Sequence, residues 1–156
     1  MGHGAGKAAL KSVDEEIMIT LLNVAAPCLV WAGVTIGVCV EAPAKFRAKT
    51  MTKAVGMDVG VQVFTAIGQT ELVLNGVAVG LMALNFEPVP AGFLAVATAL
   101  QLILHFGLRP VLNRRAEMVM AGKELPKSRV HSAFGVLTLL KIGACLATAH
   151  TAFLAG

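Results

Sequence analysis

Residues 54–84 read AVGMDVGVQVFTAIGQTELVLNGVAVGLMAL, and this stretch decides the fold class of the chain. It contains two acidic residues, Asp58 and Glu71, and no Lys or Arg. Because about 20 predominantly apolar residues in a helix span the hydrocarbon core of a bilayer, the stretch is long enough to cross a membrane. Pro88 and Pro90 follow it and predict a short, tight connection to the next segment.

The composition of the whole chain is also that of a membrane protein. Of its 156 residues, 56% are hydrophobic and 14% charged, with a mean hydropathy of +0.77. Soluble domains average about 45–50% apolar and about 25% charged residues, so an ordinary soluble domain is excluded. High apolar content also excludes a disordered chain, and three Cys are too few for a disulfide-rich module. We therefore predict an integral, multi-pass protein of a bacterial inner membrane or an organelle membrane.

The predicted fold class is all-α, a four-transmembrane-helix bundle built from two helical hairpins. Pro27 lies near the middle of the first span and predicts a kink there. A polar segment, residues 111–129, separates the last two spans and is expected to be partly helical along the membrane interface. A polar N-terminal segment, residues 1–16, precedes a transmembrane domain of residues 17–156, with predicted spans over residues 17–40, 54–84, 91–108 and 130–154.

The Lys and Arg residues predict the orientation of the spans. Ten of the 13 lie in two of the loops, whereas Lys7 and Lys11 precede the first span and Lys141 lies within the last. Basic loops stay on the cytoplasmic side, or on the matrix or stromal side of an organelle membrane, so both termini are predicted on the opposite side. We expect these loops to contact anionic lipid headgroups. No nucleic-acid partner is expected, since the cations are not interleaved with aromatic residues and the chain has no Tyr. The ten loop cations are Lys45, Arg47, Lys49, Lys53, Arg109, Arg114, Arg115, Lys123, Lys127 and Arg129.

Three polar residues fall near the middle of three different spans: Glu71, Gln101 and Lys141. Ionisable groups at this depth are costly, so each is expected to have a partner. We predict a buried polar network in which Glu71 and Lys141 are within hydrogen-bonding or one-water distance. Such a pair either fixes the register of the helices or belongs to a proton or ion relay.

Asp58, Gln62, Thr65 and Gln69 follow one another at spacings of a single helical face in the second span. This polar stripe either lines a water-filled path or faces other helices or other subunits through hydrogen bonds.

Small residues four positions apart allow two membrane helices to approach closely. Such pairs predict either packing within the bundle or docking of a partner helix. The glycine pairs are Gly33 with Gly37, Gly56 with Gly60, and Gly76 with Gly80.

His105 and His131 both lie near the basic side, at the end of the third span and the start of the fourth, which leaves a haem or metal site as an alternative. The sequence contains no P-loop, HExxH, GxGxxG or nucleophile elbow, so no catalytic motif indicates enzyme activity. We predict no cofactor in the leading interpretation.

Two segments carry a resemblance to a known family: residues 31–47, from Trp31-Ala32-Gly33 to Phe46-Arg47, and residues 109–115, Arg-Pro-Val-Leu-Asn-Arg-Arg, with His131 opening the last span. They resemble the small four-span membrane family typified by transmembrane protein two hundred and five, which implies a four-helix membrane fold. The region around Trp31 and the stretch from Lys141 to His150 are more distantly similar to the four-span haem-associated protoporphyrinogen oxidase family. That family has a His in its first span, whereas the first span here has none.

The function predicted from the sequence is that of a non-enzymatic accessory or scaffolding subunit, which packs against other membrane proteins through small-residue helix faces. The first alternative is a small transporter or proton-linked channel with a polar path along the second span. The second is a haem-binding membrane protein.

Overall fold

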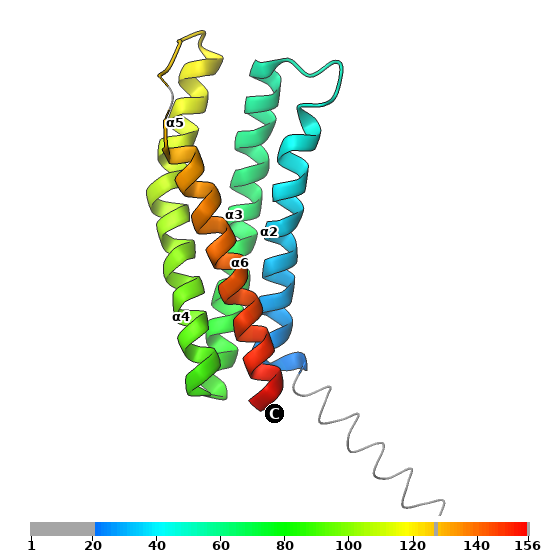
Figure 1. The fold of residues 1–156 in the computed structure, drawn as a ribbon, viewed down its shortest axis with the longest axis vertical. Coiled ribbons are helices and arrows are strands. Elements are labelled where there is room, and N and C mark those ends of the chain that lie inside the picture. The colour runs from blue at the N-terminus through cyan, green and yellow to red at the C-terminus, as the bar shows by residue number, and fades with distance from the viewer. Residues whose placement is uncertain (1–20, 127, 156) are drawn as a thin grey trace, which may run out of the picture.

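The computed structural model describes residues 21–126 and 128–155, and every regular element within these residues is a helix (Figure 1). In this described part of the chain, four helical segments are long and apolar enough to cross a membrane. The protein is thus an all-α, multi-pass integral membrane protein. The predicted N-terminal segment, residues 1–16, lies outside the described residues. The membrane-crossing segments are Asn23–Lys45, Lys53–Leu84, Pro88–Met120 and Val130–Ala155.

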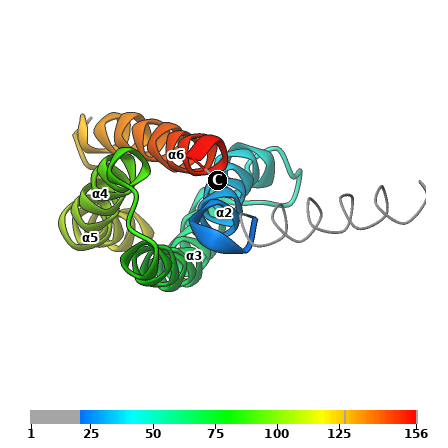
Figure 2. The ribbon, with the colours of Figure 1, turned by 90° about the horizontal axis from the view of Figure 1, so that it is seen from below.

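The bundle consists of two helical hairpins, as predicted. Helices α2 (Ala26–Lys45) and α3 (Lys53–Leu84) pack against each other, and α4 (Pro88–Leu102) packs along α6 (Val130–Ala155). Seen from below, α6, α2, α3 and α4 follow one another around the bundle (Figure 2). Helix α2 also packs against α6, which joins the two hairpins, whereas α3 and α4 touch each other less.

Pro27 predicts a kink near the middle of the first span, but the structure has the kink at the start of the membrane-crossing segment, at Asn23 within η1 (Leu21–Ala25). Pro27 itself lies in the first turn of α2. Asn23 has a non-helical ψ of −149°. Proline cannot donate to the carbonyl four residues earlier, and its ring crowds that carbonyl, which here belongs to Asn23. The first span continues to Lys45, beyond its predicted end at Val40. Its last turn begins and ends with a charged residue, and Lys45 Nζ forms an ion pair with Glu41 Oε1 at 3.4 Å.

Helix α3 begins where Thr52 caps it by accepting a hydrogen bond from the backbone N–H of Val55. It ends at Leu84, as predicted. The connection to α4 is shorter than expected, because α4 already starts at Pro88. Proline is well suited to the first turn of a helix, where its missing N–H would have no partner.

The third span departs from the sequence prediction, because it does not stop at Arg109 and Pro110. Helix α4 continues through a π-helical segment, η2 (Ile103–Leu108), into α5 (Arg109–Met120). The backbone N–H of Arg109 bonds to the carbonyl of Leu104, five residues earlier. A π-helical turn contains an extra residue, so the helix can pass Pro110 without ending. The segment predicted as interfacial is therefore largely an extension of the third span.

Helix α5 ends at a Schellman motif around Gly122. Gly122 has a φ of 78°, a left-handed conformation that glycine adopts without steric cost. The N–H of Lys123 bonds to the carbonyl of Met118 at 3.0 Å, and the N–H of Gly122 bonds to that of Val119 at 3.0 Å.

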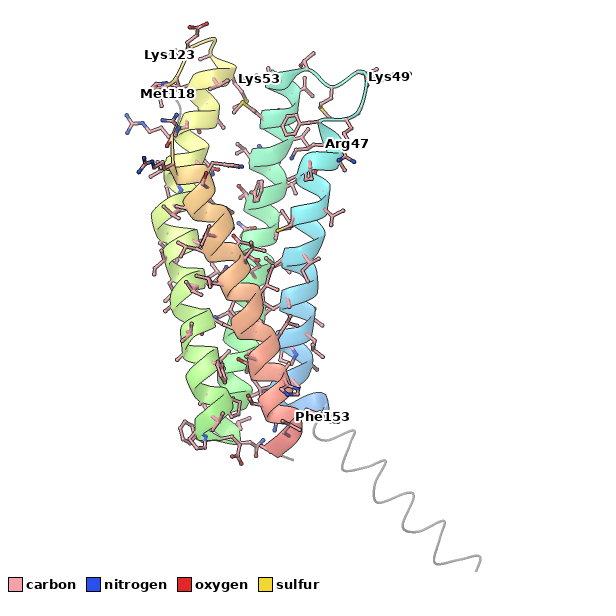
Figure 3. All side chains as sticks on the ribbon, in the orientation of Figure 1. Arg47, Lys49, Lys53, Met118, Lys123 and Phe153 are labelled. Atoms are coloured by element: carbon pink, nitrogen blue, oxygen red, sulfur yellow. The ribbon has the colours of Figure 1, made fainter. Side chains whose placement is uncertain are left out.

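Both basic loops lie at one end of the bundle, and the C-terminal end of α6 lies at the other. Arg47, Lys49, Lys53 and Lys123 are at the upper end in Figure 3, whereas Phe153 is at the lower end. We call the upper end the basic end. The predicted two-sided distribution of the loops is present, and the compartment that each side faces stays a prediction.

The apolar core occupies the half of the bundle opposite the basic end. It is built mainly from small residues and closes around the fully buried Trp31 ring. Small side chains allow membrane helices to pack closely. The core consists of Val24, Ala25, Cys28, Trp31, Ala32, Ala78, Met82, Leu94, Ala97, Ala144, Cys145, Ala149 and Ala152.

Candidate functional site

A buried polar network joins helices near the middle of the bundle, and Lys141 of α6 is its centre. Its Nζ donates to Glu71 Oε1 of α3 at 2.6 Å and to Gln101 Oε1 of α4 at 2.9 Å. All three side chains are almost fully buried. The sequence predicted contact among these three residues, and the structure places them together.

Helix α2 adds two residues that no sequence pattern placed in this network, Thr35 and Trp31. The Thr35 hydroxyl lies 2.6 Å from Glu71 Oε1 and 2.9 Å from the backbone carbonyl of Trp31. A hydroxyl has one hydrogen, so it donates to one of these acceptors at a time. The Trp31 ring centroid is 5.7 Å from Lys141 Nζ, a cation–π contact. Thr35 follows Trp31 by four residues, one helical turn, which is the only sequence signal linking them.

Arg109 also reaches the network, although the sequence predicts that it is a loop cation. Its Nη2 lies 4.0 Å from Glu71 Oε2, and its Nη1 is 2.9 Å from His105 Nδ1. The guanidinium lies over Gly68, where any Cβ would overlap it. Gly68 is thus a third residue that no sequence pattern singled out, since it has no small partner four residues away.

The π-helical segment explains why Arg109 and Gln101 both point inward. In a regular α-helix the eight residue steps from Gln101 to Arg109 would rotate the chain by about 800°, leaving Arg109 about 80° away from the Gln101 face. The wider π turn rotates the chain less per residue, so it returns Arg109 to the inward face. Both residues are buried, with 1% and 8% of their surface exposed for Gln101 and Arg109.

The network has more donors than acceptors. Glu71 is its one carboxylate, and it faces both Lys141 and Arg109, so the cluster carries one net positive charge when all three groups are ionised. The buried Arg109 Nε and Gln101 Nε2 have no hydrogen-bond partner among the described residues. The indole Nε1 of Trp31 is likewise without an acceptor there.

The network forms the floor of a cavity of about 770 Å³ that opens toward the basic end. Thr35, Glu71, Arg109 and Lys141 all line it. Above them, the walls come from α2, α3, α5, α6 and the segment before α6.

The polar stripe of α3 does not line this cavity. Asp58, Gln62 and Gln69 are exposed on the outside of the bundle, and Thr65 is half-buried, its hydroxyl bonded to the Val61 carbonyl of its own helix. The cavity instead meets the opposite face of α3, with Val61 and Phe64. A polar path along this stripe inside the bundle is therefore not present.

The predicted glycine pairs separate into two groups. A Cβ on Gly33, Gly37, Gly76 or Gly80 would meet no atom within 4 Å, so these four face away from the bundle and do not pack its helices. Gly56 and Gly60 are buried, but they accommodate side chains rather than a helix backbone. A Cβ on Gly56 would overlap the ring of Phe46, and one on Gly60 would lie 3.2 Å from Lys45 Nζ.

The two histidines considered for haem or metal have different surroundings. His105 contacts Arg109 and does not line the cavity. His131 is exposed and lines the cavity. Within the described residues, no three His, Cys, Asp or Glu side chains are grouped so that they could share a metal ion.

Comparison with known proteins leaves the family open, because no family model, no curated protein and no solved structure matches the chain.

Proposed function

We propose that this protein is a non-enzymatic accessory subunit, which packs against a transmembrane helix of another membrane protein through the outer face of α3. The outer face of α3 is defined by residues that recur at spacings of three, four or seven and therefore share one side of the helix. Its residues are Asp58, Gln62, Thr65, Gln69, Gly76 and Gly80.

The main support for this proposal is that polar side chains of α3 face outward, where lipid would leave them without hydrogen-bond partners. The amides of Gln62 and Gln69 are exposed on the bundle surface, within a membrane-crossing helix. Hydrocarbon offers them no hydrogen-bond partner, whereas a polar side chain of a neighbouring helix does.

The lower part of the same face supplies the second requirement for helix packing. Gly76 and Gly80 have open space above them, so a partner backbone can approach closely. A helix packed on the outer face of α3 would contact the amides of Gln62 and Gln69 toward the basic end. Toward the other end it would pack closely against Gly76 and Gly80. The partner we propose is therefore a transmembrane helix with small residues and at least one hydrogen-bonding side chain.

Site-specific photo-crosslinking in native membranes tests this proposal. A photoreactive residue replaces Gln69, and the matched control replaces Leu139 of α6, a lipid-facing position that is 66% exposed. We expect an adduct from position 69 that maps to a transmembrane helix of a different protein, and none from position 139.

The double variant Gln62→Leu with Gln69→Leu provides the second half of the test. Its side chains are exposed, so the isolated protein in detergent should keep its melting temperature while co-purification of the crosslinked partner is lost. The proposal fails if position 69 yields only lipid adducts, if its adduct is a second copy of this chain, or if the double variant retains the partner.

A further inference from the structure

The cavity above the polar network has the size of a ligand site. Its volume of about 770 Å³ falls within the range of about 300–1,000 Å³ that is usual for small-molecule pockets. Most of its wall is apolar. The side chains that form this wall include Val61, Phe64, Leu104, Leu112, Phe134 and Leu125.

The charged residues of the cavity are strongly unbalanced. Five cationic side chains line it, and Glu71 is the single acidic residue in the lining within the described part of the chain. Glu71 is shared between Lys141 and Arg109, and Lys45 pairs with Glu41, which lies outside the lining. The five cations are Lys45, Lys53, Arg109, Arg115 and Lys141.

Two of these cations are held inward rather than extended into water. The Lys45 side chain is 8% exposed and lies near two aromatic rings, with Nζ 5.6 Å from the Phe46 centroid and 5.9 Å from the Phe64 centroid. Gly60 leaves the room that its ammonium occupies. The Arg109 side chain is 10% exposed, and its buried Nε has no hydrogen-bond partner within residues 21–126 and 128–155.

An anion is the species that these features favour. A charge in a low-dielectric interior is costly without a counter-charge, and Glu71 is shared between two cations. A guanidinium binds carboxylate and phosphate groups particularly well, because its donors match their planar, bidentate geometry.

We propose that this cavity binds an anionic amphiphile, whose carboxylate or phosphate group contacts Arg109 and whose apolar body lies against the aliphatic and aromatic walls. The cavity is distinct from the outer face of α3, so this inference does not depend on the proposed accessory role.

A fluorescent fatty acid, dansyl-undecanoate, tests the proposal with the full-length protein in a neutral detergent. Trp31 is the only Trp of the chain and lies beside Lys141, whose side chain lines the cavity, so energy transfer from Trp31 to the dansyl group reports occupancy. Dodecanoate, dodecyl phosphate, dodecanol and inorganic phosphate serve as competitors.

We expect dodecanoate or dodecyl phosphate to displace the probe at a concentration at least about tenfold lower than dodecanol. The reason is that a hydrogen bond to a charged group contributes about 1.5–3 kcal/mol. Stronger competition by dodecyl phosphate would indicate a phospholipid, and stronger competition by dodecanoate a free fatty acid. Equal competition by dodecanol would overturn the proposal, and so would equal competition by inorganic phosphate.

Two pairs of variants locate the site. Arg109→Gln should weaken probe binding about tenfold, whereas Arg114→Gln, an exposed Arg outside the cavity, should not. Gly135→Leu adds a side chain at a position that lines the cavity, and Gly143→Leu adds the same side chain elsewhere on α6; neither new Cβ meets an atom within 4 Å. Gly135→Leu should lower probe affinity and Gly143→Leu should leave it unchanged. If Arg109→Gln does not fold, the Gly135 and Gly143 comparison decides, and equal binding by those two variants contradicts the proposal.

Discussion

Lys141 Nζ lies 2.6 Å from Glu71 Oε1, although the two residues are 70 positions apart in the sequence. The contact joins α6 of the second hairpin to α3 of the first, near the middle of the bundle. Gln101 and Thr35 bond to the same pair, so all four membrane-crossing segments contribute to one polar network.

Replacing one partner of this pair should destabilise the protein strongly. Glu71→Leu leaves Lys141 and Arg109 buried without a carboxylate, and removing one partner of a buried pair typically costs about 3–5 kcal/mol. Lys141→Met leaves Glu71 facing Arg109 at 4.0 Å and should cost less. The double variant leaves Arg109 as the one buried charge of the network, so it should recover part of the loss caused by Glu71→Leu. The measurement is thermal unfolding of the purified protein in detergent.

A matched control uses the ion pair at the end of α2. Glu41→Gln breaks the contact with Lys45, but Glu41 is 36% exposed, so the loss should stay below about 1 kcal/mol. If the losses from the two buried substitutions simply add in the double variant, Glu71 and Lys141 are not energetic partners.

Gly68→Ala should also destabilise the protein. The added methyl group would overlap the Arg109 guanidinium and push it from Glu71; overpacking of this kind costs about 1–3 kcal/mol, against a gain of up to about 1 kcal/mol because Ala is the better helix former. Gly76→Ala on the same helix meets open space and should be neutral or stabilising by up to about 1 kcal/mol, because Ala is the better helix former. Equal melting temperatures for these two variants would show that the Arg109 guanidinium does not pack against Gly68.

Deletion of one residue from the π-helical segment should be tolerated. Deleting the exposed Phe106 converts η2 to regular α-helix and keeps Gln101 and Arg109 on the inward face. Deleting Ala99 from the regular part of α4 rotates the following residues by about 100° and removes Gln101 from Lys141. Loss of that charged hydrogen bond costs about 1–3 kcal/mol, so the Ala99 deletion should melt at the lower temperature. The reverse order would contradict an extra residue in η2.

The orientation of the bundle can be measured with reporter fusions in bacteria. Alkaline phosphatase, which is active outside the cytoplasm, should be inactive when fused after Lys49 or Gly122 and active when fused after Gly156. Green fluorescent protein at the same positions should give the opposite pattern. Activity of the phosphatase at Gly122 would reverse the predicted orientation or remove a span.

The sequence by itself determined the number and nature of the spans, because the cost of exposing polar groups to lipid requires long apolar helices. The same cost identified Glu71, Gln101 and Lys141, since buried polar residues at one depth need partners. The kink from Pro27 also follows from local chemistry, because proline always lacks its N–H.

Only the tertiary structure decided which side of each helix faces inward. The stripe from Asp58 to Gln69 and the pair Gly76 and Gly80 have clear helical spacing, yet spacing does not say whether a face meets the bundle or the outside. Arg109 joined the network only because the π turn rotates it inward, and its room depends on Gly68, 41 positions earlier in the chain. Such contacts between residues far apart are set by the packing of whole helices, which no local pattern records.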